Sequence, residues 1–267
     1  MVRVDEVMDK SLSIEANTAE FLLAMGRAGD GEERADERIQ WVIGGSPIDY
    51  HNCVVRADLT PETADAEIDA SLDRMRVHGV PGTWHVGPSM RPPDLGERLA
   101  RHGFTYGGDD IGMAVDLDAL PDRVEAPAGL TVARVEDAAA LAAWTRTLGM
   151  GFGEGEREAT WVGAVYARIG LGDDVPWRHY TGLLDGLPVA TSSLFLGAGV
   201  AGLYFVFTVP EARGQGIGAA LSLAPLLEAR ALGFHVGVLG ASTMGYPVYR
   251  RLGFREHCRM ALYEWRP

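Results

Sequence analysis

The sequence is organised around residues 203–220, LYFVFTVPEARGQGIGAA. Residues 204–209 form a run of aromatic and β-branched residues, which predicts a β-strand. Pro210 cannot donate a hydrogen bond to a strand ladder, so we expect the strand to end there. A glycine-rich segment, residues 213–218, comes next, and an apolar helical pattern begins at Gly218. The stretch therefore predicts a strand that leads through a glycine-rich turn into a helix.

This arrangement is typical of an anion site. The start of a helix leaves backbone N–H groups without partners and carries partial positive charge. Glycines let the backbone approach a bulky ligand, so we predict a bound pyrophosphate. A turn that is glycine-rich without a ligand is the alternative, but each helical glycine costs up to about 1 kcal/mol relative to alanine. Arg213 either pairs with the anion or holds the turn.

A dinucleotide site is a weak alternative. Gly214, Gly216 and Ala219 satisfy the G-x-G-x-x-G/A fingerprint, which requires an acidic residue roughly 20 positions later, at the end of the next strand. The next strand is predicted at residues 235–239, and Gly-Ala-Ser follows it without a carboxylate. The chain also lacks the Gly-Lys-Ser/Thr of a lysine-bearing phosphate loop.

Residues 213–218, Arg-Gly-Gln-Gly-Ile-Gly, resemble the R/Q-x-x-G-x-G/A signature of the GNAT superfamily of acyl-CoA-dependent N-acetyltransferases. Residues 242–254, STMGYPVYRRLGF, resemble the N-x-x-A-x-x-L-Y-x-x-L-G-F segment of the same family. Ser242 stands at the Asn position and Gly245 at the Ala position. The resemblance covers residues 130–265, or about half of the chain.

The resemblance implies that acetyl-CoA is the cosubstrate and that no metal takes part. In the family, the strand before the turn splays from its neighbour, and the gap admits the pantetheine arm. Backbone groups of Phe207 and Val209 would hydrogen-bond the pantetheine amides, as an added strand would. The implied cofactor-binding residues are Phe207, Thr208, Val209, Arg213, Gly214, Gln215, Gly216, Ile217, Gly218, Ala219, Ser242 and Tyr249.

The implied reaction is direct attack of a primary amine on the thioester. A backbone N–H on the splayed strand would stabilise the oxyanion. Tyr249 matches the family's general-acid tyrosine, and a phenol of pKa about 10 is a suitable proton donor to the leaving thiolate. Tyr246 is a second candidate for the proton donor, and a packing role is the alternative for Tyr249.

The sequence also departs from the family pattern. Many members carry a glutamate on the splayed strand as general base, whereas residues 204–208 include no acid. Deprotonation of the amine then falls to water, to His179 or to a carboxylate near Glu154, or is needless for an amine of low pKa. Because of this departure, an acyl-CoA-binding regulator or pseudoenzyme without turnover stays open beside the acetyltransferase. A protein N-acetyltransferase is a third possibility.

A second glycine-rich segment, residues 149–156, lies between two predicted helices. In the family the corresponding region shapes the acceptor site. Glu154, Trp161 and Tyr204 are therefore predicted to bind the acceptor, a small-molecule amine. The alternative is a solvated loop next to a core tryptophan. The formal net charge of −13 suits a cationic acceptor and argues against nucleic acid as a partner.

LARHGF at residues 99–104 aligns with YRRLGF at residues 249–254, and the predicted elements follow the same order in both halves, which indicates an internal duplication, with a chance match as the alternative. The first half's counterpart of the phosphate turn, residues 57–62, has no glycine and carries two acids, which would repel a pyrophosphate. We therefore expect an α/β (α+β) protein of two GNAT-like domains, each a mixed, mostly antiparallel sheet flanked by helices. The predicted division is a degenerate domain at residues 1–123, a linker at residues 124–129 and an acyl-CoA-binding domain at residues 130–267.

Composition sets the remaining expectations. The chain has 267 residues, 47% of them hydrophobic, which is enough for a sizeable core. No apolar run is long enough to span a membrane, and residues 1–30 lack the features of a signal peptide, so we expect a cytoplasmic protein without a membrane partner. Cys53 and Cys258 have no ligand spacing, which favours two buried thiols over a metal site or disulfide. The oligomeric state is open, with a homodimer as one option.

Overall fold

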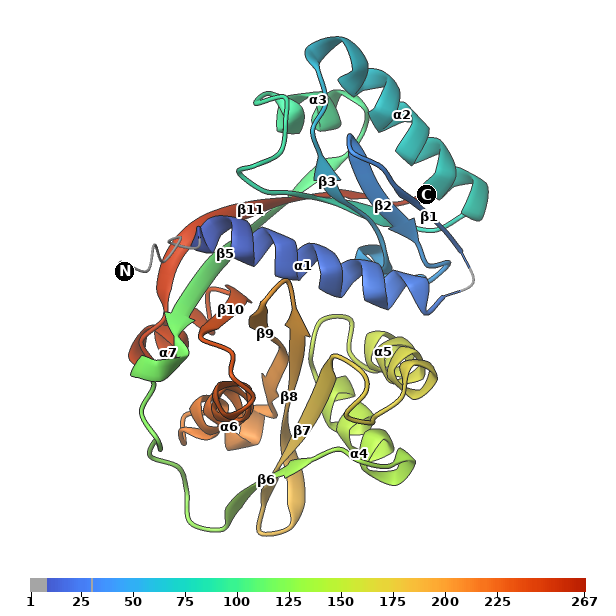
Figure 1. Ribbon diagram of the computed structural model, residues 1–267. Coiled ribbons are helices and arrows are strands. Elements are labelled where there is room, and N and C mark those ends of the chain that lie inside the picture. Colours follow the sequence, from blue (N-terminus) through green and yellow to red (C-terminus); the bar gives the residue numbers. More distant parts are fainter. Residues whose placement is uncertain (1–8, 30) are drawn as a thin grey trace, which may run out of the picture.

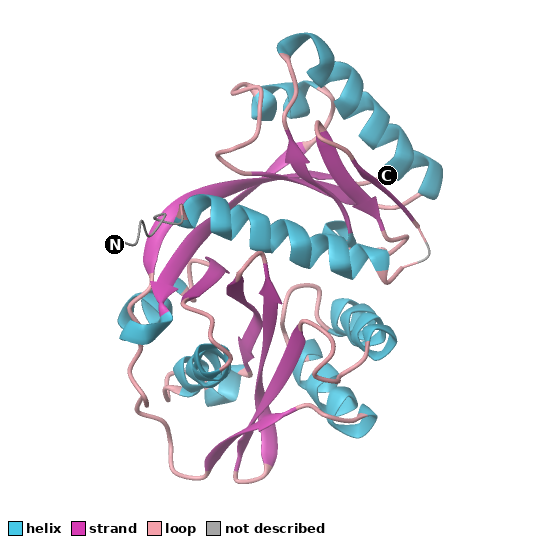
Figure 2. Cartoon of the chain, viewed as in Figure 1, coloured by secondary structure: helices cyan, strands magenta, loops and turns pink. Residues whose placement is uncertain are grey.

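The computed structural model describes residues 9–29 and 31–267 (Figures 1 and 2). Part of the segment considered above for a signal peptide lies outside these residues. The helices are α1 (Lys10–Arg27), η1 (Asp49–His51), α2 (Pro61–His78), α3 (Leu95–Arg101), η2 (Leu117–Ala119), α4 (Ala138–Gly149), α5 (Glu156–Ile169), η3 (Pro210–Ala212), α6 (Ile217–Ala231) and α7 (Tyr246–Arg251). The strands are β1 (Glu32–Ala35), β2 (Ile39–Ile43), β3 (Asn52–Ala57), β4 (Gly82–Val86), β5 (Thr105–Asp116), β6 (Leu130–Arg134), β7 (Trp177–Leu184), β8 (Leu187–Gly197), β9 (Val200–Thr208), β10 (Val236–Ala241) and β11 (Arg255–Trp265).

All of these strands belong to one eleven-stranded sheet with the order β1-β2-β3-β4-β11-β5-β10-β9-β8-β7-β6. Neighbouring strands are antiparallel except for the two parallel pairs, β3 with β4 and β9 with β10. Helices flank the sheet, as Figure 2 shows. The predicted mixed α/β class with a mostly antiparallel sheet is confirmed, although the two halves share one sheet.

The two halves exchange their last strands. β5, the last strand of the first half, pairs with β10, whereas β11, the last strand of the chain, pairs with β4. β5 and β11 also pair with each other and run side by side through the middle of the molecule (Figure 1). The sheet is therefore continuous across the predicted linker, and the predicted domain boundaries at residues 123 and 130 stay a prediction.

Because of this exchange, residues 130–267 expressed alone are not expected to fold. In that fragment β10 loses its neighbour β5, and β11 loses both of its neighbours. Thermal unfolding followed by circular dichroism should show no cooperative transition for the fragment, and co-expression with residues 1–129 should restore one. A cooperative transition of the isolated fragment would contradict this prediction.

Local sequence signals fixed most of the elements. Thr60 caps α2 in a capping box with Pro61 at the first position, as its start signals predict. Asp185-Gly186, a dipeptide typical of tight hairpin turns, joins β7 to β8. The first half of β5, however, is a polar, glycine-rich segment with low strand propensity, and it is extended because it pairs with β11.

The two halves of the chain share two local features. β3 and β4 pair only at Cys53 with Thr83 and Val54 with Trp84, and β9 and β10 likewise pair at two positions. The aligned Gly-Phe pairs also match, since Phe104 N–H donates to Leu99 O at 3.0 Å and Phe254 N–H donates to Tyr249 O at 3.0 Å. Leu99 of the first half therefore occupies the position of Tyr249 in the second half.

Helix α1 lies between the two halves (Figure 1). Its Asn17 donates to Gly197 O at 2.9 Å and accepts from the Tyr204 hydroxyl at 2.8 Å. Phe21 stacks on the Tyr204 ring with centroids 3.6 Å apart. On the side of the first half, the Glu15 carboxylate accepts from Ser89 N–H at 3.0 Å. Both cysteines are buried and free, as expected from their spacing.

The described residues include neither a membrane-spanning helix nor a metal-binding cluster. None of the helices among them is long and apolar enough to cross a membrane. Likewise, they contain no group of three or more His, Cys, Asp or Glu side chains that is arranged to hold a metal ion.

Candidate active site

The site begins where β9 separates from β10. The two strands pair only at Ala201 with Gly237 and at Gly202 with Val238, and no pairing joins them beyond that point. β9 also carries a bulge, because its register against β8 shifts and Phe205 takes a φ of 49°. The Thr191 hydroxyl donates to Phe205 O at 2.9 Å and holds the bulge. The second half of β9 is therefore free of a neighbour on the β10 side.

The exposed backbone groups of β9 belong to alternate residues. Val209 N–H donates to Val189 O on β8 at 2.9 Å, and its carbonyl accepts from Ala212 N–H at 3.0 Å. Because neighbouring residues of a strand point their backbone groups to opposite sides, those of Thr208 face the gap. By the same alternation the backbone groups of Phe207, which pairs with Thr191, point to β8, so neither predicted contact with the pantetheine arm, at Phe207 or at Val209, has a free backbone N–H to support it.

The glycine-rich turn presents a row of unpartnered N–H groups. Gly214 and Gly216 have φ values of 76° and 83°, a conformation that favours glycine. The first backbone bond of α6 runs from Ala220 N–H to Gly216 O at 3.1 Å. Among the described residues, no acceptor bonds the N–H groups of residues 214–219. The turn therefore has the donors that the sequence predicts for an anion site.

Arg213 holds this turn. Its Nε donates to Thr208 O at 3.0 Å, and its guanidinium lies 5.7 Å from the centroid of the Phe207 ring. Arg213 still lines the cleft described next, together with Arg251, and no aspartate or glutamate lines it. In a chain with a formal net charge of −13, this wall is thus locally cationic.

These features border one cleft of about 580 Å³, within the size range of small-molecule sites. Ten of the predicted cofactor-binding residues line it: Phe207, Thr208, Arg213, Gly214, Gly216, Ile217, Gly218, Ala219, Ser242 and Tyr249. Of the other two, Gln215 is exposed on the turn, and Val209 is buried beneath it. Ser242 also accepts from Gly245 N–H at 3.1 Å at the start of α7.

Tyr249 lies on α7 at the wall of this cleft. Its ring packs against Phe254 with centroids 5.8 Å apart. Its hydroxyl makes no hydrogen bond to any of the described residues. Burial raises the pKa of Tyr249 to about 12, so the phenol is protonated at neutral pH. Tyr249 therefore contributes a protonated phenol to the lining of the cleft, whereas Tyr246 does not line it.

The three predicted acceptor-binding residues are not gathered at the cleft. Tyr204 is bonded to α1, as described above. Glu154 pairs with Arg157 at 2.9 Å and lies 3.6 Å from Arg266. Trp161 lines a separate cavity of about 140 Å³ between α5 and the first half. Their role in acceptor binding stays a prediction.

His179, one of the bases considered above, is buried on β7. Its Nδ1 lies 2.8 Å from Ser193 Oγ, and its ring packs 3.8 Å from the Tyr166 centroid. Burial, with the charges of Arg178 and Arg134, lowers the pKa of His179 to about 3. His179 is therefore a weak base and does not line the cleft.

Sequence reasoning missed part of the cleft wall. The additional lining residues include Gly151, Phe152 and Gly153, which precede α5, and Met244 and Arg251, which flank Tyr249 in sequence. The position of Arg251, two residues after Tyr249, was the available signal for a second cation. The glycine-rich composition of residues 149–156 was noted, but composition alone does not give the direction of a loop.

No protein-family model matches the sequence, and the search of curated proteins returned no match. Solved structures do match the fold. A GCN5-related N-acetyltransferase from Kribbella flavida has a TM-score of 0.68 and 19% identity, covering 96% of this chain and 95% of that one. The chain has the GNAT fold. A conserved protein of unknown function from Staphylococcus epidermidis has a TM-score of 0.65 and 14% identity, covering 88% of this chain and 94% of that one.

The GNAT fold extends over both halves. A tandem GNAT protein from the clavulanic acid biosynthesis pathway has a TM-score of 0.57 and 17% identity, covering 98% of this chain and 95% of that one. At such identities the likeness is one of fold, and the chemistry of the cleft has to be argued from its own residues.

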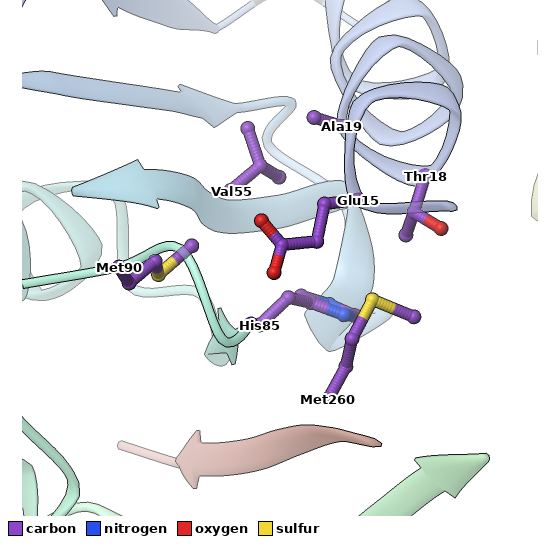
Figure 3. Close-up of a pocket in the computed structure, with 8 residues that line it drawn as sticks. Glu15, Thr18, Ala19, Val55, His85, Met90 and Met260 are labelled. Carbon is purple, nitrogen blue, oxygen red and sulfur yellow. The ribbon is translucent and has the colours of Figure 1, made fainter. Parts of the chain in front are cut away.

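The first half has a closed counterpart of the β9–β10 gap. β3 and β4 separate after Val54 and Trp84, but a bridge between Asp58 and Arg91 closes the gap again. The Glu15 carboxylate of α1 lies inside it with His85, Met90 and Met260, as Figure 3 shows. The remaining cavity is about 10 Å³, which is room for about one water. A wider groove of about 600 Å³ lies outside Glu15, along α1, and carries acids and arginines of both signs.

Proposed function

We propose that the protein is an acyl-CoA-dependent N-acetyltransferase that moves an acetyl group from acetyl-CoA to a primary amine of a small molecule. One observation carries the proposal: a single cleft brings together a bare row of N–H groups, an unpaired strand edge and the protonated Tyr249. The lining residues fit the phosphates of coenzyme A, because they include two arginines and no carboxylate. The acyltransferase neighbours support the same class of reaction.

The chain's residues would divide the work as follows. The N–H groups of residues 214–219 bind the pyrophosphate. The free edge of β9 orients the pantetheine arm, and a β9 N–H group stabilises the oxyanion that forms at the thioester carbonyl. Acetyl-CoA supplies the activated acyl group, to which the neutral amine adds. Tyr249 gives its proton to the leaving thiolate as the carbon–sulfur bond breaks, the new amide loses its extra proton to solvent, and solvent returns a proton to the Tyr249 phenolate.

An acyl-CoA-binding protein without turnover is the second candidate. It is favoured by the absence of any Asp, Glu or His among the residues that line the cleft. A protein N-acetyltransferase, which would acetylate an amine of a protein in place of a small amine, is the third candidate. The cytoplasmic location and a homodimer also remain predictions.

An assay of thiol release separates the candidates. With acetyl-CoA and a panel of small amines, the acetyltransferase is expected to release coenzyme A at a rate that rises with the concentration of at least one of the amines. Calorimetric binding of acetyl-CoA without thiol release from any amine or peptide would favour the second candidate. A protein that does not bind acetyl-CoA would contradict both.

A further inference from the structure

The loop before α5 forms one wall of the cleft and has little structure of its own. Gly151, Phe152 and Gly153 line the cleft, and Gly153 and Gly155 have positive φ values of 49° and 69°. The loop's own backbone bonds are short-range, such as Gly155 N–H to Phe152 O at 2.7 Å. Since glycines give the backbone many accessible conformations, the position of this wall depends on contacts from outside the loop.

One such contact is a buried carboxylate. Glu158, on the first turn of α5, is only 4% exposed. Its Oε2 accepts from Glu154 N–H at 2.8 Å, which ties the carboxylate to the loop backbone. A Cβ added at Gly153 would collide with the same carboxylate. The loop is therefore packed directly on Glu158.

The other oxygen of this carboxylate is bound from the first half of the chain. The Tyr50 hydroxyl donates to Glu158 Oε1 at 2.6 Å, across 108 positions of sequence. Tyr50 lies in η1, and the neighbouring Asn52 fixes that segment with side-chain bonds to Ser46 O and Pro81 O, both at 2.8 Å. The donor is thus held by the first half, independently of the loop that it supports.

The surrounding charges make this hydrogen bond important. Asp49 and Glu154 lie near Glu158, and Arg266 is 3.2 Å from Asp49 and 3.6 Å from Glu154. Arg157 also pairs with Glu154. None of these arginines bonds Glu158 itself. Without the Tyr50 hydroxyl, a buried carboxylate oxygen would lose its partner beside two other acids, and the loop would rearrange to hydrate it.

We propose that Tyr50 of the first half is a positioning residue for the cleft. Tyr50 acts on the cleft through Glu158 and the loop of residues 149–155. The first half would then contribute to acyl-CoA binding without a cofactor site of its own. The kinetic test of this inference rests on the proposed function, whereas the test of loop order by hydrogen exchange rests on the structure alone.

The test is Tyr50→Phe, compared with Tyr106→Phe. Tyr106 is a matched control, because it is an exposed tyrosine of the first half whose hydroxyl also bonds a carboxylate, Asp109, at 2.7 Å. We expect Tyr50→Phe to raise the KM for acetyl-CoA about tenfold, the loss expected for a hydrogen bond to a charged group, with kcat within about twofold. Tyr106→Phe should change neither constant.

Hydrogen exchange gives the second readout. Tyr50→Phe should speed exchange of the amides of residues 150–156 and leave those of α6 unchanged. Glu158→Ala removes the acceptor of the same hydrogen bond, so the double variant should be no worse than the Glu158→Ala single variant. Unchanged loop exchange, or exchange that rises equally in the loop and α6, would overturn the inference. If the wild type fails to bind acetyl-CoA, the proposed function fails, while the exchange experiment still decides the role of Tyr50.

Discussion

Gly218→Glu is expected to lower the affinity for coenzyme A by at least about 100-fold. Gly218 lies in the first turn of α6 and lines the cleft where the phosphates are proposed to bind. A carboxylate there would meet phosphate charge, and two unit charges 4 Å apart near a protein surface repel by about 4 kcal/mol. Since about 1.4 kcal/mol is tenfold in affinity, even a partly screened repulsion gives this loss. Isothermal calorimetry with coenzyme A measures the effect.

The structure makes Gly218 a cleaner position for this test than Gly216. A Cβ at Gly216 would collide with the Glu125 carbonyl, and Gly216 has a positive φ, so a substitution there would also strain the fold. At Gly218 the nearest atom to an added Cβ is Thr208 Oγ1 at 3.7 Å, an ordinary contact. Gly218→Ala is therefore the control and should bind coenzyme A within about threefold of the wild type, a difference below 1 kcal/mol. Equal affinity of Gly218→Glu and Gly218→Ala would rule out a phosphate site at this turn.

Tyr249→Phe is expected to lower kcat about 100-fold or more, while the affinity for acetyl-CoA stays within about twofold. General acid catalysis by one positioned group typically contributes about 10²- to 10⁴-fold. The phenol ring, which packs against Phe254, is kept by the substitution, so the cleft should keep its shape. Steady-state kinetics together with calorimetric binding of acetyl-CoA separate the two effects.

The control for this prediction is Tyr246→Phe, on the same helix but outside the lining of the cleft. It should change kcat by less than about twofold, because it removes no proton donor from the site. Equal losses of turnover and affinity in Tyr249→Phe would instead indicate a packing role.

The pH dependence of kcat gives a further check on the role of Tyr249. Because burial raises the pKa of Tyr249 to about 12, its proton is retained at lower pH and is lost only as the pH rises through that value. A fall in kcat near pH 8 would therefore belong to another group.

The centre of the site was predictable because its signals are local. Pro210 ends β9, and the glycines at positions 214, 216 and 218 mark the turn and the start of α6. Tyr249 followed from its place in a short motif. All of these features lie between residues 210 and 249 and are marked by short sequence motifs.

The rest of the site depends on contacts that sequence spacing does not encode. Tyr204 was predicted to face the acceptor, but its hydroxyl is bonded to Asn17 of the distant helix α1. Glu158 was not singled out, because its partner Tyr50 lies in the other half of the chain. β5 and β11 have similar local patterns, so nothing in either strand indicates that each pairs within the opposite half.

The exchanged strands give the sheet an approximate twofold symmetry. In the order β4-β11-β5-β10, a half-turn about an axis between β11 and β5 places each strand of one half on its counterpart in the other. A pair of half-length chains that swapped their final strands would have this same arrangement, with two equivalent gaps. The present chain resembles such a pair joined end to end, in which one gap was closed by Glu15 and the other was kept open. Fusion of this kind lets a single protein hold an unequal pair of sites, which a symmetric homodimer of half-length chains cannot do.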